Sequence, residues 1–479
     1  MIRKLHAGIV LLLSIAILLP AGCRKKQDTE DDAAADEPPA RGEPAARTRA
    51  EPARGPNIIF LTIDTLRADH LSCYGYSRNT SPFIDLLASR GFVFQNAYSG
   101  SPWTAPSMAT LFTGLYPREH GVLHGRVAGR GIDSQEMISR DLITLPVALK
   151  NAGYRTYGIS ANGHLSKNTG FARGFDFFEL HWFDKCPVPH ITATRLKDEL
   201  AKPGAFFLWI HYFDPHAPYM ARSPWVDVYA KDRAECDKWA GTQMRELRSQ
   251  LGEIRRNPAA APALSDLYDS EVSYCDQYIR KLFEEVIPTN GNNLVVITSD
   301  HGEEFLDHNA IGHGHTLYEE VVHVPLIFVV PGRTDVPMVI ERPVSNKDVF
   351  STILDLAGVR STRRIPGASL APWMVRGAAA DYGPVYLSLD RGRNWKGVRS
   401  GDMKLICTGR ELKKCGVYNL SEDPGETRNL ERKGTKTGEG LREMLTGWLA
   451  AKPVREAPVA RQKLDRDQVE KLRSLGYLK

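Results

Sequence analysis

Two long apolar segments of this chain end in side chains that can bind a metal ion. Residues 57–63 are followed by Asp64, and residues 293–299 are followed by Asp300 and His301. Such runs are typical of parallel strands buried on both faces, and sheets of this kind bind ligands at the carboxyl ends of their strands. A buried carboxylate needs a partner of opposite charge. Two carboxylates and an imidazole therefore predict a site for a divalent cation, although Asp64 could instead cap a following helix.

A threonine stands where a helix is predicted to begin. Residues 103–107 are typical of a turn, and residues 108–112 of the first turns of a helix that ends at Gly114. Pro106 favours a helix start, because proline lacks an N–H and its φ is already helical. Thr104 would then lie at the amino end of the helix, where unpaired N–H groups and the helix dipole favour negative charge. This position suits an alcohol that attacks an anionic ester, and the alternative is that Thr104 is only an N-cap.

This stretch, residues 101–117, resembles the signature segment of the sulfatase family, within the alkaline phosphatase superfamily. Four positions match the family pattern: Pro106, Ser107, Thr113 and Gly114. Thr104 replaces the cysteine that sulfatases oxidise to formylglycine, and Met108 replaces the arginine of the pattern. The resemblance implies that no formylglycine forms here and that Thr104 itself is the nucleophile, as in phosphoryl-transfer branches of the superfamily.

The metal-binding residues follow the family pattern as well. Residues 57–76 resemble its opening segment, in which Asp64 binds the metal, and residues 299–303 resemble a segment specific to this superfamily. Thr65 stands where many relatives carry a second aspartate. The resemblance implies one bound divalent ion, which is Ca²⁺ in sulfatases and Zn²⁺ or Mn²⁺ in phosphoryl-transfer relatives. The types of ligand do not decide among these ions.

Histidines in three loops complete the candidate site by the same resemblance. His164 follows a predicted strand where the family has Gly-Lys-Trp-His, and Asn162 stands in place of the lysine. His216 lies in a proline-rich loop after another predicted strand, where Asp214 is placed to orient it. In the family, such histidines contact the ester oxygens or protonate the leaving group. Without the family match, a histidine in a loop of this kind would be interpreted as structural.

The third loop offers two candidates. His313 and His315 both lie where the family has a lysine or a histidine against the ester oxygens, and the sequence does not choose between them. His120 also follows the family pattern, with His124 nearby, and both are interpreted as surface loop residues. Both lysines that the family would place around the transferred group are absent. We therefore expect a site tuned differently from that of a sulfatase acting on monoesters.

The resemblance covers about residues 56–430 and implies an α/β fold of the alkaline phosphatase type. A mixed, mostly parallel sheet between helix layers would form a catalytic domain at residues 55–375. A small antiparallel sheet with a helix, followed by a helical tail, would occupy residues 376–479. Cys407 and Cys415 flank a predicted hairpin in this C-terminal part, which favours a disulfide between them.

The N-terminal segment predicts export and a lipid anchor. Residues 1–22 combine Arg3 and Lys4 with an apolar run too short to span a membrane, as in a lipoprotein signal peptide. Cys23 ends a stretch that resembles a bacterial lipobox, so it would carry the lipid. Residues 23–54 are rich in alanine, proline and charge and are predicted to form a disordered tether. We expect a lipid-anchored protein of the bacterial cell envelope, at the periplasmic face or at the outer membrane or cell surface.

Composition is that of a globular protein without a nucleic-acid partner. The chain of 479 residues is 42% hydrophobic and 25% charged, and a net charge of +5 is too small at this length to indicate nucleic-acid binding. The predicted substrate is an anionic ester, on a glycan or a lipid head group. Residues 221–262 have no counterpart in the family and are expected to form a surface excursion that shapes access to the site.

The sequence thus predicts a metal-dependent hydrolase of sulfate or phosphate esters, with phosphoesters and phosphodiesters favoured. A sulfated Thr104 would have no formylglycine hemiacetal to expel the group, so its turnover would depend on water attacking the covalent ester. Two alternatives stay open. One is a cell-envelope phosphotransferase of the phosphoglycerol or phosphoethanolamine type, and the other is a catalytically inactive relative that binds a surface ligand.

Overall fold

The structure is a computed structural model that describes most of the chain after residue 52. The described residues are 53–124, 126–129, 132–289, 292–333, 336–360, 366–375, 382–392, 394–409, 411–431, 438–452, 460–463, 466 and 469–470. The predicted signal peptide, Cys23, nearly all of the tether and most of the predicted C-terminal helix lie outside these residues. Among the described residues, no helix combines the length and the apolar composition that crossing a membrane requires.

A central sheet of eight strands organises the described part of the chain. Its strands, in spatial order, are β14 (Met338–Ile340), β2 (Phe92–Phe94), β13 (Leu326–Val329), β9 (Asn293–Ser299), β1 (Asn57–Ile63), β8 (Phe206–Tyr212), β6 (Arg155–Ser160) and β7 (Phe177–Leu180). Within this sheet, only β13 runs antiparallel to its neighbours. The predicted mixed, mostly parallel sheet is therefore confirmed.

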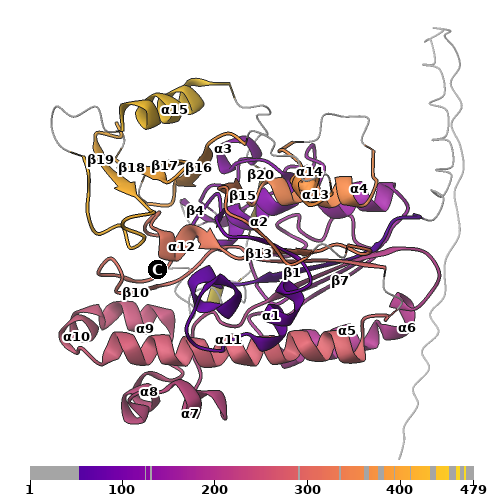
Figure 1. Ribbon diagram of the computed structural model, residues 1–479, viewed down its shortest axis with the longest axis horizontal. Helices are drawn as coiled ribbons and strands as arrows, with labels where there is room; N and C mark the ends of the chain where they lie inside the picture. The colour runs from indigo at the N-terminus through magenta and orange to yellow at the C-terminus, as the bar shows by residue number, and fades with distance from the viewer. Residues whose placement is uncertain are drawn as a thin grey trace, which may run out of the picture. The chain divides into compact units, whose positions relative to one another are not determined.

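Strand β1 explains why both faces of the sheet are covered. Ile58 and Phe60 point into the core on one face, and Ile59 and Leu61 point into the core on the other, as alternation along a strand requires. The first face is covered by α2 (Thr104–Thr113), α4 (Leu145–Asn151) and α13 (Asp348–Leu356). The second face is covered by α1 (Pro82–Ala88), α5 (Pro187–Arg195) and the long α11 (Ala260–Glu285), as Figure 1 shows. The sheet thus lies between helix layers, as predicted.

The C-terminal part contains the small antiparallel sheet that the sequence predicts. Its strands are β16 (Val385–Leu389), β17 (Trp395–Ser400), β18 (Met403–Thr408) and β19 (Lys414–Asn419), and α15 (Glu439–Ala450) packs against them. The predicted disulfide between Cys407 and Cys415 is present, at directly paired positions of β18 and β19. The boundary that we predict at residue 376 falls at residues 376–381, which lie outside the described part of the chain.

Shorter elements connect these layers. After β1 come η1 (Ala68–His70), η2 (Ser72–Tyr74), β3 (Ala97–Tyr98), α3 (Pro117–His120), β4 (Arg126–Gly129), β5 (Ile132–Met137) and α6 (Lys197–Leu200). The surface excursion forms α7 (Trp225–Tyr229), α8 (Arg233–Trp239), α9 (Met244–Ser249) and α10 (Leu251–Arg256). After β9 come β10 (Glu304–Phe305), β11 (Ile311–Gly312), α12 (Glu319–Val322), β12 (His323–Val324), β15 (Val344–Ser345), α14 (Ala371–Val375) and β20 (Ala460–Lys463).

Two features differ from the sequence prediction. Strand β20, near the end of the chain, pairs with β5 in the first third, where no strand pairing was predicted. His120 is not a surface loop residue, because it is buried and its Nε2 lies 3.1 Å from Thr110 Oγ1 on α2. Burial lowers the pKa of His120 to about 3, so this imidazole is neutral and serves packing around α2. His124 is exposed, as predicted.

Candidate active site

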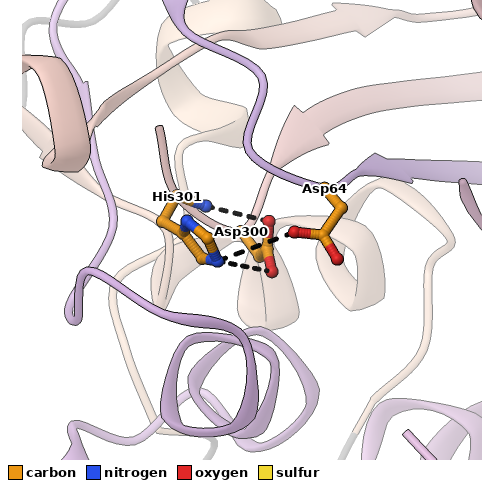
Figure 2. Close-up of side chains that lie close together, drawn as sticks. All are labelled: Asp64, Asp300 and His301. Carbon is orange, nitrogen blue, oxygen red and sulfur yellow. Dashed lines mark hydrogen bonds and ion pairs between the residues drawn. The ribbon is translucent and has the colours of Figure 1, made fainter. Parts of the chain in front are cut away.

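Three candidate metal ligands meet at one edge of the central sheet. Because β1 and β9 are parallel neighbours, Asp64 and Asp300 follow strand ends that lie side by side. His301 Nε2 lies 3.4 Å from Asp300 Oδ2 and 3.7 Å from Asp64 Oδ1, and one possible ligand atom from each residue lies within 4.8 Å of the others. Figure 2 shows the three side chains converging, and all three are fully buried. The structure brings together the residues that the sequence singles out.

The chemistry of this cluster fits a divalent cation. Asp64 Oδ1 and Asp300 Oδ2 are buried without a hydrogen-bond partner. His301 Nδ1 donates to the Gly302 carbonyl oxygen at 2.9 Å, so the lone pair of Nε2 is left to face the carboxylates. Burial raises the pKa of Asp64 to about 7, and burial together with the neighbouring Asp64 raises the pKa of Asp300 to about 6. Two buried carboxylates with outward-facing lone pairs are costly unless a cation binds between them.

The backbone turns sharply at Thr65, directly after the first ligand. Thr65, directly after Asp64, has φ 58°, a left-handed conformation that β-branched residues rarely adopt. This conformation aims the Thr65 N–H at Asp300 Oδ1, 3.3 Å away, and the next N–H, of Leu66, donates to Ser299 Oγ at 2.9 Å. The strained residue thus links the carboxyl ends of β1 and β9, and strain of this kind is common at functional sites.

The raised carboxylate pKa values predict how pH affects the metal-free protein. Both side chains have a folded-state pKa above the unfolded value of 3.8, so the folded state binds more protons between about pH 4 and pH 7. The free energy of unfolding should therefore fall, by on the order of a few kcal/mol, as pH rises from 5 to 8.

Denaturant unfolding of the chelated protein at several pH values measures this dependence. Burial also raises the pKa of Glu271 to about 8 and of Asp276 to about 7, so the wild type must be compared with Asp300→Asn, which isolates the site. The free energy of unfolding of the variant should fall less as pH rises. In the wild type, saturating cation should remove the part of the fall that comes from Asp64 and Asp300. Identical pH profiles for wild type and variant would contradict the prediction.

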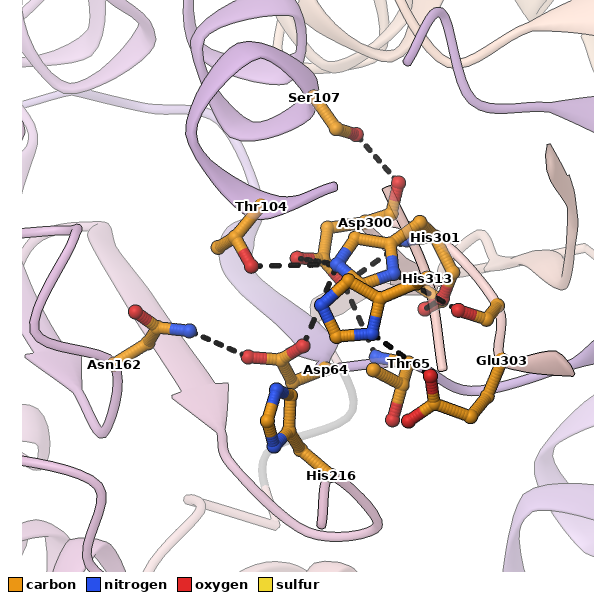
Figure 3. A network of polar contacts seen from close by, with 12 residues as sticks. Asp64, Thr65, Thr104, Ser107, Asn162, His216, Asp300, His301, Glu303 and His313 are labelled. Atoms are coloured by element: carbon orange, nitrogen blue, oxygen red, sulfur yellow. Dashed lines mark hydrogen bonds and ion pairs between the residues drawn. The ribbon is translucent and has the colours of Figure 1, made fainter. Parts of the chain in front are cut away.

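Thr104 begins helix α2 and faces the cluster. Its Oγ1 lies 3.3 Å from His301 Nε2, as Figure 3 shows, and the residue is fully buried. Ser107 Oγ, one turn later, donates to the carbonyl oxygen of Asp300 at 2.5 Å and so fixes the helix start against β9. Pro106 is the third helical residue rather than the first, where a missing N–H is still harmless because the first four N–H groups have no intrahelical partner. Thr104 is at the helix amino end, as predicted, but residues 104–107, which were expected to form a turn, are already helical.

Two side chains that the sequence analysis did not assign to the metal site support Asp64. Asn162 Nδ2 donates to Asp64 Oδ2 at 2.6 Å, and His211 Nε2 lies 3.4 Å from the same oxygen. Because the Asp64 carboxylate accepts, His211 Nε2 carries the proton, and His211 Nδ1 accepts from Thr62 Oγ1 at 2.8 Å. Thr62 Oγ1 in turn accepts from Trp209 Nε1 at 3.0 Å. The sequence could have indicated Asn162, because it follows a predicted strand, as Asp64 does. Its contact with Asp64 could not be predicted, because it depends on the order of the strands in the sheet.

The contact of Asn162 predicts a role in holding the metal ligand. Asn162→Ala removes the hydrogen bond that orients Asp64, and outer-shell partners of this kind typically change metal affinity by about 10–100-fold. We expect the dissociation constant for the cation to rise within this range in isothermal titration calorimetry. Asn79→Ala, at an exposed asparagine, is the control. An unchanged dissociation constant in Asn162→Ala would show that Asp64 is held without the amide.

Two of the predicted histidines stand next to the cluster. The ring centroid of His313 lies 4.3 Å from that of His301 and 5.1 Å from that of His216. His313 Nδ1 donates to Glu303 Oε1 at 2.8 Å, and Tyr219 OH donates to the other oxygen of Glu303, also at 2.8 Å. The carboxylate therefore fixes the His313 ring with Nδ1 protonated and Nε2 basic. Figure 3 shows His216 beside Asp64, and His313 next to His301 and facing Glu303.

The surface excursion supports the loop that carries His313. Arg248, on α9, donates from Nη2 to the carbonyl oxygen of His313 at 2.9 Å. Gly312 has φ +88°, and a Cβ there would come within 2.8 Å of Arg248 Nη2, so this loop needs a glycine. Residues 221–262 thus hold a candidate catalytic loop in place.

The two remaining candidates, His164 and His315, make contacts with residues outside the cluster. His164 packs edge-on against Trp103, with ring centroids 6.2 Å apart, and Gln135 Nε2 donates to His164 Nδ1 at 3.0 Å, which leaves the proton on Nε2. His315 is bound through Nε2 to Glu304 Oε2 at 2.7 Å, and among the described contacts it makes none with His301 or Thr104. Of the two histidines between which the sequence did not choose, the structure brings His313 into the cluster.

The interpretation of Asp214 is wrong. Asp214 Oδ2 accepts from the Cys186 N–H at 2.6 Å, and Oδ1 pairs with Lys185 Nζ at 3.1 Å. His216 instead donates from Nδ1 to the carbonyl oxygen of Ala217 at 2.6 Å. The turn of the chain directs Asp214 away from His216, and the carbonyl oxygen of Ala217 binds the imidazole instead. The sequence does not show the path of the backbone in this turn.

Comparison with known families defines the class of this site. Residues 56–359 match the family model described as Sulfatase, and residues 313–450 match the model described as N-sulphoglucosamine sulphohydrolase, C-terminal. The chain therefore belongs to the sulfatase family, within the alkaline phosphatase superfamily, and is a hydrolase of sulfuric or phosphoric esters.

Individual relatives agree in sequence and in fold. The uncharacterized sulfatase YidJ of Escherichia coli strain K12 is 26% identical over 78% of this chain and 83% of its own length. The solved structure of a phosphonate monoester hydrolase of Agrobacterium radiobacter has a TM-score of 0.66 and 18% identity, over 82% of this chain and 94% of the other. A structure solved with its substrate D-glucosamine-2-N,6-O-disulfate has a TM-score of 0.66 and 22% identity, over 83% and 97%.

Proposed function

We propose that the chain hydrolyses phosphate esters, including diesters, in preference to sulfate esters, with Thr104 as nucleophile and a divalent cation at Asp64, Asp300 and His301. The observation that carries this proposal is the position of Thr104 Oγ1, buried at the amino end of α2 and 3.3 Å from His301 Nε2. The cation is Ca²⁺ by family resemblance, with Zn²⁺ and Mn²⁺ as alternatives. When bound, it supplies positive charge that favours the ionised hydroxyl and offsets charge on the transferred group.

The side chains around Thr104 account for the protons. Thr104 Oγ forms a bond to phosphorus while the bond from phosphorus to the leaving oxygen breaks. Nε2 of His313 or His216, which carries the lone pair because each Nδ1–H is bound to an acceptor, takes the hydroxyl proton and passes it to the leaving alcohol. His164 Nε2–H donates to a non-bridging oxygen. Water then cleaves the phosphothreonine, releases the phosphoryl product and restores the hydroxyl.

Phosphorus is favoured because Thr104 cannot become formylglycine. Sulfate release from formylglycine uses the second hydroxyl of its hydrate, which a threonine ester lacks, whereas phosphothreonine can be hydrolysed by activated water. The structural likeness to a phosphonate monoester hydrolase is the reason to keep phosphonate esters in the test. The likeness to a protein with a disulfated glucosamine as substrate is the reason to keep sulfate esters and glycans among the candidates.

We also propose where the enzyme acts and on what. The predicted signal peptide and Cys23 would place it, by a lipid anchor, in the bacterial cell envelope, at the periplasmic face or the outer membrane or cell surface. A substrate there would be an anionic ester on a glycan or a lipid head group. Residues 221–262, which hold the His313 loop, are placed to shape its entry.

A matched substrate panel tests the proposal. Metal-loaded protein is assayed with aryl sulfate, aryl phosphate, an aryl phosphodiester and a phosphonate monoester that share one leaving group, followed by intact-mass analysis. Phosphoester turnover with an adduct on the protein whose mass equals the transferred group (phosphate from the monoester, the substituted phosphoryl group from the diester or phosphonate) would support the proposed hydrolase. Sulfate turnover alone would contradict the preference for phosphorus. Transfer to an added alcohol in place of water would favour the phosphotransferase, and no turnover with the metal bound would favour the inactive surface-binding relative.

A further inference from the structure

The C-terminal sheet delivers a cation to the start of helix α2. Arg391 lies in the turn that follows β16, and its Cζ is 5.1 Å from the ring centroid of Trp103. Trp103 directly precedes Thr104 in the chain and is buried, whereas Arg391 is partly exposed. The guanidinium therefore lies between solvent and the residue next to the nucleophile.

Two sets of contacts fix this turn in place. The N–H of Ser388 donates to the carbonyl oxygen of Gly100 at 3.0 Å, which ties β16 to the segment leading into Trp103. The carboxylate of Asp390 accepts from Ser388 Oγ at 2.6 Å and from Lys396 Nζ at 2.5 Å. Arg391 is thus carried on a clamped turn rather than on a free loop, and its position relative to α2 is built into the fold.

The field of Arg391 reaches the candidate catalytic residue His164. After burial, the guanidinium is the second cause that lowers the pKa of His164, to about 3. The loop that carries His313 lies against the same tryptophan, because a Cβ on Gly314 would come within 3.5 Å of Trp103 Cβ. Arg391, His164 and the loop that carries His313 therefore all lie against Trp103, the residue that precedes Thr104.

Arg391 lies near a site in which one lysine of the family pattern is absent. The family pattern has a lysine where this chain has Asn162, and the Asn162 amide is occupied by Asp64. Lys185, whose charge also acts on Asp64, is paired with Asp214.

We propose that Arg391 binds the non-bridging oxygens of the group transferred to Thr104, an inference that rests on the proposed function. A guanidinium can donate two parallel hydrogen bonds to a phosphoryl group, which a single ammonium cannot do. Arg391 would therefore be a specificity residue supplied by the C-terminal sheet. Arg391, in the C-terminal part of the chain, would supply the positive charge that the lysine at the position of Asn162 gives other members of the family.

The test measures anion binding separately from turnover. Inorganic phosphate is titrated calorimetrically into the full, metal-loaded chain of the wild type, Arg391→Ala, Arg391→Lys and Arg280→Ala. Arg280, paired with Glu284 on the exposed face of α11, is the matched control. We expect Arg391→Ala to raise the dissociation constant for phosphate at least about tenfold, Arg391→Lys to raise it less, and Arg280→Ala to leave it unchanged. KM for the aryl phosphodiester should rise in the same order.

Other outcomes separate this inference from the proposed function. Unchanged phosphate affinity in Arg391→Ala, in a protein whose turnover depends on Thr104, would overturn the role of Arg391 and leave the hydrolase standing. A raised KM with unchanged phosphate affinity would overturn it too, because Arg391 would then contact the leaving group. No turnover by the wild type, with phosphate binding that depends on Arg391, would overturn the hydrolase but support the anion site. If Arg391→Ala fails to fold, Asp390→Asn loosens the clamped turn and should weaken phosphate binding to a smaller extent.

Discussion

Thr104→Ala is expected to lower kcat for ester hydrolysis by about a thousandfold or more, while the protein remains folded and still binds its cation. Removal of a nucleophile typically costs this much or more, because only background reaction by bound water remains. Truncation to alanine leaves helix α2 intact, since Ser107 still joins it to the Asp300 carbonyl oxygen. Steady-state kinetics with the aryl phosphodiester measure the expected loss of rate. Intact mass after brief mixing measures the expected loss of the covalent adduct, which with this substrate keeps the second ester group on phosphorus.

Two further variants make this result specific. Thr113→Ala removes a buried hydroxyl from the same helix, whose hydrogen bond within the described part of the chain goes to the Ala109 carbonyl oxygen at 2.6 Å, and should leave kcat nearly unchanged. Thr104→Ser keeps a hydroxyl at the same place and should retain much of the rate and the adduct. Turnover that survives Thr104→Ala at the wild-type rate would mean that water, not Thr104, attacks the ester.

Asp300→Asn is expected to abolish cation binding and at the same time to stabilise the metal-free protein. The amide keeps an oxygen for the N–H groups of Thr65 and His301, which lie 3.3 and 3.0 Å from Asp300 Oδ1. Its nitrogen replaces Oδ2, which lies 3.4 Å from the lone pair of His301 Nε2 and lacks a hydrogen-bond partner in the wild type. In the variant, the amide nitrogen of residue 300 can donate to His301 Nε2. The negative charge that a cation requires is lost.

The expected sizes follow from the loss of a direct ligand. Since even outer-shell partners change metal affinity by about 10–100-fold, loss of Asp300 should weaken binding at least a hundredfold, to about the limit of calorimetric detection. Removal of a buried like charge beside Asp64 should raise the free energy of unfolding of the apo protein by on the order of 2 kcal/mol at pH 8.

Thermal unfolding with and without cation reports both effects. Added cation should raise the Tm of the wild type and not that of the variant, because only a bound ligand stabilises the folded state. Asp355→Asn, at an exposed aspartate on α13, should behave like the wild type. A wild-type Tm that does not respond to Ca²⁺, Zn²⁺ or Mn²⁺ would contradict the metal site itself.

The sequence alone determined the strands and the residues at their ends. The apolar runs before Asp64 and Asp300 could be recognised as buried strands, since a strand covered on both faces needs apolar side chains at nearly every position. The start of helix α2 at Thr104 and the disulfide between Cys407 and Cys415 were predictable for a similar reason. Each depends on residues that are close in sequence, so local composition carries the information.

The tertiary structure alone decided which side chains meet. The order of strands in the sheet puts Asn162 against Asp64, and the path of the loop after β9 brings His313, not His315, beside His301. Arg391 reaches Trp103 from a sheet formed nearly 300 residues later in the chain, and no local pattern marks it. Contacts of this kind depend on how separately folded segments pack, and packing is a property of the whole chain that periodicity and spacing along one segment do not contain.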